Sequence, residues 1–99
     1  MTYAVFIQSA GGTIDVFHRV VDLLPAGPPE GLLMQVAGQG DGGVAVLSVW
    51  RSKEDADRFF ADYHAPALVK VLGAPPPPPT AMIEFEATDM LVTEPASST

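Results

Sequence analysis

The sequence predicts a small α+β domain with the element order β-α-β-β-α-β, and three observations lead to this prediction. An apolar, strand-like segment runs directly into a capped amphipathic helix between Gly42 and Tyr63. Tyr3–Gln8 is rich in aromatic and β-branched residues, as an opening strand should be. Residues 38–43 hold four glycines, and the Asp-Gly step among them is typical of a β-hairpin.

The first half of the chain predicts a strand, a helix and a second strand. Thr13 is expected to cap a helix that runs to about Leu24, with Asp15 in the first turn, where the helix dipole favours an acid. Pro25 stops this helix, and Leu32–Ala37 is expected to be the second strand. The apolar residues of the helix recur at helical spacing: Ile14, Phe17, Val20, Val21 and Leu24.

The second half begins with a third strand, Val44–Trp50, followed by a helix. Ser52 and Asp55 resemble a capping box at the start of this helix. The Ala65-Pro66 step is expected to break or kink it, because a proline disfavours helical geometry in the residue before it. A short helix should then run from Pro66 to Leu72 and end at Gly73.

Five consecutive prolines, Pro75–Pro79, separate the last helix from a fourth strand at Ala81–Ala87. Such a run favours an extended polyproline II segment, which could be a stiff connector or a motif that binds another protein. Glu94–Thr99 is expected to be a flexible tail. We therefore expect one domain over residues 1–93 and a tail over 94–99.

With right-handed crossovers, this order gives a four-stranded antiparallel sheet with both helices on one face, the ferredoxin-like arrangement. The face without helices should then be polar. Instead, residues 44–50 (VAVLSVW) are apolar at every position except Ser48, and only the fourth strand alternates, with Glu84 and Glu86. An exposed apolar sheet promotes aggregation, so we expect a second copy of the chain to cover this face.

Composition excludes several classes of function. The chain has 99 residues, no cysteine, and twelve acids against five bases, for a net charge of −7. Without cysteine there is no disulfide, thiolate metal site or cysteine nucleophile, which suits a reducing cytoplasm. The acidic balance argues against nucleic acid or an anionic membrane as a partner. We expect a cytoplasmic protein without a signal peptide or a membrane-spanning segment.

The element order, the segment VWRSKEDADRFF at 49–60 and the Pro-Ala-Leu that follows at 66–68 resemble the dimeric α/β-barrel proteins. Within that superfamily they are similar to the antibiotic-biosynthesis-monooxygenase-like (ABM-like) domains, over residues 3–92. The resemblance implies a homodimer in which two sheets face each other and each subunit has a pocket between its helices and its sheet. Some members oxidise aromatic polyketides without metal or flavin, some degrade haem, and others isomerise or decarboxylate small molecules.

The haem-degrading branch carries an asparagine near the end of the first strand, then a tryptophan and a histidine ten residues apart. This sequence has Gln8, Phe59 and Val69 at those positions. The axial ligand is missing, so we expect neither haem nor another cofactor. The two histidines also make a poor metal site, because no acid cluster stands near them at ligand spacing.

The two histidines, His18 and His64, are the candidate catalytic residues. His18 and Asp22, one turn apart, could form a general base or a solvent-exposed helix pair. His64 could transfer protons beside the pocket, with Tyr63 as a hydrogen-bond donor, or could only place a cation at a helix C-terminus. We rank His64 above His18.

Substrate contacts are expected from aromatic residues and one amide. Trp50 could stack on a flat ligand or seal the core, and Gln8 could orient a carbonyl or begin a loop. The candidate substrate-binding residues are Phe6, Gln8, Phe17, Trp50, Phe60 and Tyr63. We expect a homodimeric, cofactor-independent monooxygenase-like enzyme or proton-transfer catalyst for a small apolar or aromatic molecule. The alternative is a non-catalytic homodimeric module that binds a ligand or a protein.

Overall fold

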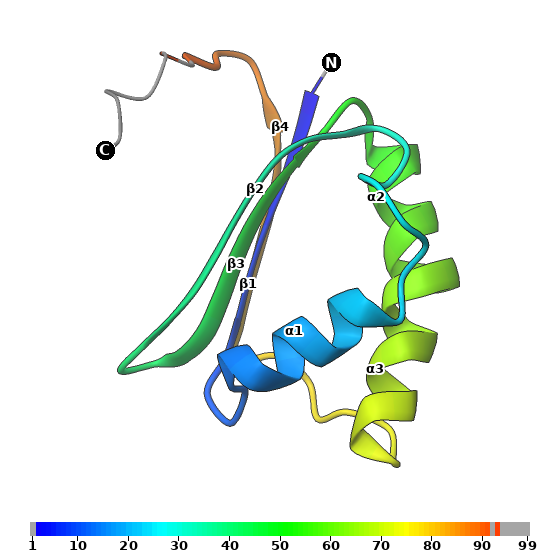
Figure 1. Cartoon of the computed structure of the whole chain (residues 1–99). Coiled ribbons are helices and arrows are strands. Elements are labelled where there is room, and N and C mark those ends of the chain that lie inside the picture. Colours follow the sequence, from blue (N-terminus) through cyan, green and yellow to red (C-terminus); the bar gives the residue numbers. More distant parts are fainter. Residues whose placement is uncertain (1, 92, 94–99) are drawn as a thin grey trace.

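The computed structural model describes residues 2–91 and 93, and it has the predicted α+β, ferredoxin-like fold. The four strands form one antiparallel sheet in the order β2-β3-β1-β4, and the helices lie on one side of it (Figure 1). The predicted tail, 94–99, lies outside the described residues. The elements are β1 (Thr2–Ser9), α1 (Ile14–Asp22), β2 (Leu32–Gly40), β3 (Gly43–Trp50), α2 (Lys53–Phe59), η1 (Phe60–His64), α3 (Ala65–Leu72) and β4 (Ala81–Ala87).

Local chemistry explains where most elements begin and end. The Thr13 side chain accepts a hydrogen bond from the Val16 N–H, as a helix N-cap should. Ser52 caps α2 in the same way, through the Asp55 N–H. Gly73 ends α3 in the left-handed conformation, at φ 75°. The hairpin is tighter than predicted, because β2 extends to Gly40 and leaves only two residues between the strands.

The long second helix differs from the prediction, because Ala65-Pro66 does not break it. Ala65 has helical backbone angles, φ −61° and ψ −47°, and its N–H donates to the carbonyl of Phe60, five residues earlier. This wider π-helical turn, η1, joins α2 to α3 without interruption. A proline in a regular α-helix lacks an N–H and clashes with the carbonyl four residues earlier. The wider turn relieves that clash, so the helix continues through Pro66.

One end of the helix-facing side of the sheet is tightly packed. The indole of Trp50 is fully buried, lies 5.1 Å from the ring of Phe59, and donates its Nε1–H to Ser48 Oγ at 2.9 Å. Val5 and Ala56 complete this cluster from β1 and α2, with exposed fractions of 1% each. We call this cluster the packed end.

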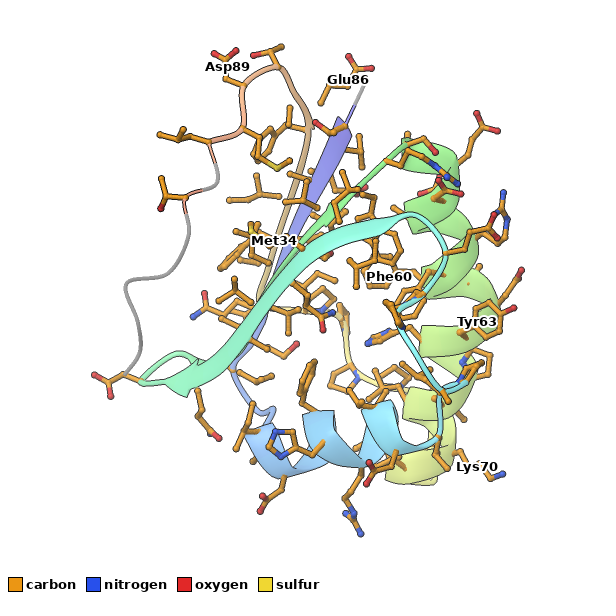
Figure 2. The ribbon with its side chains drawn as sticks, turned by 45° about the horizontal axis from the view of Figure 1, so that its top comes forward. Met34, Phe60, Tyr63, Lys70, Glu86 and Asp89 are labelled. Atoms are coloured by element: carbon orange, nitrogen blue, oxygen red, sulfur yellow. The ribbon has the colours of Figure 1, made fainter. Side chains whose placement is uncertain are left out.

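The other face of the sheet is apolar and carries no helix. Strand register sends alternate residues to it, and Figure 2 shows Met34 on the side away from the helices. Val36, Ile83 and Phe85 are all more than half exposed, at 58%, 56% and 51%. Glu84, in contrast, is on the helix side, where it accepts a hydrogen bond from the Tyr3 hydroxyl at 3.0 Å. We call this surface the open face.

Within the described part of the chain, no helix is both long and apolar enough to cross a membrane.

Candidate functional site

A cavity of about 1050 Å³ lies between the sheet, α1 and the long helix. Its floor is the half of the sheet beyond the packed end, at Ile7 of β1 and Val44 and Val46 of β3. Val16, Phe17 and Val20 of α1 and Leu68 and Leu72 of α3 supply most of the apolar walls.

The cavity exists because the long helix contacts the sheet at only one end. α2 contacts β1 and β3, whereas α3 packs against α1. In Figure 1 the helix draws away from the sheet toward its C-terminal end, and α1 crosses the space between them. The side chains there do not fill this space. The site is therefore a wedge that opens as the helix leaves the sheet.

His64 lines this cavity and is half-buried. It belongs to η1, and its ring lies 5.3 Å from the ring of Phe60 and 6.1 Å from that of Phe59. Burial lowers the pKa of His64, because an apolar environment disfavours the charged imidazolium. The imidazole is therefore neutral near pH 7, and its unprotonated nitrogen can accept a proton.

His18 lies elsewhere. It is exposed on α1, outside the cavity lining, and its ring is 5.9 Å from the ring of Phe17. No ion pair joins His18 to Asp22, both of which the structure describes. The two histidines are thus not brought together, and only His64 faces the cavity.

The predicted substrate-binding residues divide into two groups. Phe17, Phe60 and Tyr63 line the cavity, and Tyr63 is 46% exposed. Figure 2 shows Phe60 in the space between the long helix and the sheet. Phe60 and Tyr63 both belong to the π-helical segment, which also carries His64. One irregular turn therefore supplies three of the lining side chains.

Phe6, Gln8 and Trp50 do not line this cavity. Phe6 lies in a shallow depression on the open face, beside Leu47. Strand alternation sends Gln8 to the same face, where its side chain lies against Gly42 of the hairpin. Trp50 faces the helices but is enclosed in the packed end. The structure thus places Phe6 and Gln8 on the wrong side of the sheet for a contact in this cavity.

Sequence reasoning missed a charged cluster at the α2 end of the cavity. The carboxylate of Asp55, itself buried, accepts hydrogen bonds from Arg51 Nε at 3.1 Å and Arg58 NH1 at 3.2 Å. The hydrogen bond from Arg51, with help from Ser52, lowers the pKa of Asp55. Gly31 has φ +85°, and a Cβ there would come within 2.5 Å of the same carboxylate. The cluster fixes the loop before β2 against α2, which is a structural role.

The proline run is a second feature that sequence reasoning did not connect to the site. Pro76, Pro77 and Pro78 line the cavity, and so does Thr80. These residues are distant in sequence from α1 and the sheet, although Leu72 of α3 lies only four residues before Pro76. Hydrophobic periodicity cannot reveal such a contact, because the segment has no regular secondary structure.

The arrangement of the donor side chains bears on metal binding. Over residues 2–91 and 93, no three or more histidine and acidic side chains gather where they could hold an ion. The cavity instead has a largely apolar surface, and its polar lining residues include one imidazole, the amide of Gln35 and the charged side chains of Asp55 and Arg58. This set fits a small organic molecule better than a metal.

Comparison with solved structures places this fold among the ABM-like proteins. A Chloroflexus aurantiacus protein described as an antibiotic biosynthesis monooxygenase is similar with a TM-score of 0.65 and 14% identity, over 93% of this chain and 98% of its own. A monooxygenase from the ActVA-Orf6 gene of Streptomyces coelicolor, in complex with nanaomycin D, gives 0.55 and 20%, over 94% and 92%. SnoaB, a cofactor-independent oxygenase from Streptomyces nogalater, gives 0.52 and 20%, over 91% and 94%.

No protein-family model matches the sequence, and no curated protein matches it either. The chain thus shares the α+β, ferredoxin-like fold of these three solved structures. At these identities the likeness concerns the fold, and one fold supports many reactions.

Proposed function

We propose that this protein is a homodimeric, cofactor-independent monooxygenase-like enzyme that acts on a small, largely apolar aromatic molecule. The observation that carries the proposal is the cavity of about 1050 Å³, with the half-buried imidazole of His64 among apolar walls. Ligand sites are usually concave, mostly apolar and equipped with a few polar groups. This cavity has that character and lies on the helix side of a sheet, where the resemblance implied a pocket.

His64 is the proposed general base. A neutral imidazole in an apolar site can remove a proton from a methylene that neighbouring aromatic rings or carbonyls have made acidic. The carbanion then gives electrons to dissolved O₂. One oxygen atom becomes bonded to the carbon and the other leaves as water, so that CH₂ + O₂ gives C=O + H₂O. Tyr63, which also lines the cavity, would donate a hydrogen bond to a substrate oxygen.

Two similar structures support this choice of reaction. One is described as a cofactor-independent oxygenase, and another was solved with nanaomycin D bound. The lining is largely apolar, and Gln35 of β2 supplies it with an amide, whereas Gln8 lies on the opposite face of the sheet.

The homodimer in this proposal rests on the open face. Val36, Ile83 and Phe85 are more than half exposed there, and a monomer rarely exposes a continuous apolar sheet. A second copy packed sheet against sheet would cover these side chains, and an obligate interface of this kind buries more than ~2,000 Å². We expect light scattering at micromolar concentration to give twice the chain mass. Phe85→Glu should shift it toward one chain mass, and a stable wild-type monomer would refute the dimer.

A non-catalytic ligand-binding or protein-interaction module is the second candidate. The observation that favours it is the largely apolar surface of the cavity. The two candidates differ in what His64 does. A module needs the cavity for affinity alone, whereas an enzyme also needs a base within reach of the reacting carbon.

The experiment compares His64→Ala with His18→Ala as a matched control, because His18 lies outside the cavity. Wild-type protein is supplied with a panel of aromatic phenols and ketones, and O₂ consumption and ¹⁸O incorporation are measured. We expect His64→Ala to lower turnover at least about tenfold, which corresponds to about 1.4 kcal/mol, and His18→Ala to change it little. Binding without oxygen incorporation, and equal small effects of both changes on affinity, would instead indicate the module.

A further inference from the structure

We propose that Pro76–Pro78 form a rigid wall of the cavity that selects flat, uncharged ring systems. This inference rests on the proposed function of the cavity as a ligand site. Of the five prolines, Pro76, Pro77 and Pro78 line the cavity, whereas Pro75 and Pro79 do not. In Figure 1 this segment runs from the end of α3, past α1, to β4.

The segment is fixed at both ends. At its start, the Gly73 N–H donates to the carbonyl of Val69 at 2.8 Å and terminates α3. At its end, Thr80 Oγ1 accepts a hydrogen bond from the Ala10 N–H at 2.8 Å, and Ala81 pairs with Gln8 in the sheet. Only a few residues separate these anchors, so the prolines between them have little freedom to move.

Proline suits a wall of irregular backbone beside an apolar space. Backbone N–H groups that face such a space without a partner cost free energy. Each proline removes its own N–H and fixes φ near −65°. Consecutive prolines also hold an extended shape without internal hydrogen bonds. The wall is therefore rigid before a ligand arrives, which lowers the entropy lost on binding.

The chemistry of this wall indicates the class of ligand. Proline rings present C–H groups and no charge. The negatively polarised face of an aromatic ring is attracted to such positively polarised hydrogens. A charged group here would lose its hydration and gain no partner from the prolines. Val16 and Phe17 of α1 and Leu72 of α3 continue the apolar lining. A flat, uncharged polycycle fits this surface best.

This placement also bears on the alternative role of the proline run. A domain that binds a proline-rich segment needs access to successive proline rings along one side of the helix. Here three consecutive members of the run line the cavity. Pro76 is half-buried, whereas Pro77 and Pro78 border the cavity but stay exposed, so the assignment of the run to the ligand site of its own chain rests first on Pro76.

Matched double variants test the inference. Pro76→Ala with Pro78→Ala removes two rings that line the cavity, and Pro75→Ala with Pro79→Ala removes two that do not. Each variant loses two of the five prolines, so any general loosening of the connector is the same. The probes are fluorenone, which is flat, and dicyclohexyl ketone, which has the same number of carbon atoms but is not flat.

We expect the Pro76/Pro78 variant to lose about tenfold in affinity for fluorenone, measured by titration calorimetry, and less than about threefold for dicyclohexyl ketone. The Pro75/Pro79 variant should bind both probes as the wild type does. Equal losses of affinity in the two variants would mean that only the stiffness of the connector matters, and would refute the selective role of Pro76–Pro78. Unchanged affinity in both variants would also refute this role of the prolines, but the cavity would remain a ligand site. A wild-type protein that binds neither probe would refute the ligand site itself.

Discussion

Two halves of the same sheet surface behave differently in this protein. At the packed end, Val5 of β1 lies beneath α2 and is 1% exposed. Farther along, Val46 of β3 faces the same side but is only half-buried and lines the cavity. The residue type is the same and the two strands are paired. The difference is the distance to the helix above, so helix placement determines which half of the sheet is core and which is site.

We call the half of this surface over Ile7, Val44 and Val46, which borders the cavity, the hollow end. A gain in folding stability does not explain why it is hollow. A buried space lined by apolar side chains costs free energy in proportion to its volume. Here the side chains above Val44 and Val46 include Phe17, Phe60 and Leu68, which are large enough to pack more closely. Instead, α2 contacts the sheet while α3 packs against α1, and the walls stay apart. An arrangement that sacrifices packing is expected where a ligand binds.

The largest effect on stability should come from the packed end. Trp50→Ala removes a fully buried indole that packs on Phe59, and it deprives Ser48 of its donor. We expect unfolding in urea to show a loss of about 3–5 kcal/mol. A loss below about 1 kcal/mol would mean that this end is not the core of the domain.

The same substitution at the two ends tests the comparison more sharply. Val5→Ala should cost about 2 kcal/mol, because it opens a space in a filled core. Val46→Ala should cost less than about 1 kcal/mol, because the side chain already borders a space. Both values come from urea unfolding monitored by circular dichroism. Equal losses at the two positions would show that the hollow end is packed as tightly as the core.

Ser48→Ala probes the boundary between the two ends. Ser48 Oγ is the acceptor for the Trp50 Nε1–H and itself lies 3.4 Å from the carbonyl of Val5. Its loss leaves the buried indole N–H without this acceptor, at a cost of about 1–2 kcal/mol. Ser48→Thr keeps a hydroxyl at this position and serves as the control. If both variants were equally destabilised, the cause would be space and not the hydrogen bond.

The smallest effect concerns pH. Burial lowers the pKa of His64 in the folded protein, so the unfolded chain binds the proton more readily. Stability should therefore fall as the pH drops below roughly 6.5, the ordinary value for histidine, toward the lowered pKa of the folded state. His64→Gln should flatten this part of the profile. A wild-type profile that rises as pH falls over the same range would contradict the burial of His64.

Sequence periodicity and capping were enough to predict the fold. Apolar segments rich in aromatic and β-branched residues, together with the Asp-Gly hairpin, identified the strands, and Ser52 with Asp55 marked the start of α2. Of the break or kink expected at Ala65-Pro66, the break was wrong, because the rule for proline is local and a wider helical turn satisfies it. That turn depends on how the whole helix packs, which no local pattern reveals.

The site was predictable only in part. His64, Phe17, Phe60 and Tyr63 were candidates and line the cavity. Phe6 and Gln8 were also candidates but lie on the face of β1 opposite the cavity, as alternation from the core residues Tyr3 and Val5 would have indicated. The proline wall depends on a contact between residues far apart in the chain. Three-dimensional placement was required to find it.

The central claim is that the hollow end of the sheet binds an apolar aromatic molecule. Val46→Phe tests it most directly, because the larger ring occupies the floor of the cavity. Val69→Phe is the matched control, since Val69 is 40% exposed on α3 and does not line the cavity. Fluorenone is titrated calorimetrically into the wild type and both variants, whose folding is checked by thermal melting.

We predict saturable binding, one molecule per chain, for the wild type and Val69→Phe, and a loss of at least about tenfold for folded Val46→Phe. Equal affinity in all three proteins would contradict the account, because the probe would then bind outside the hollow end.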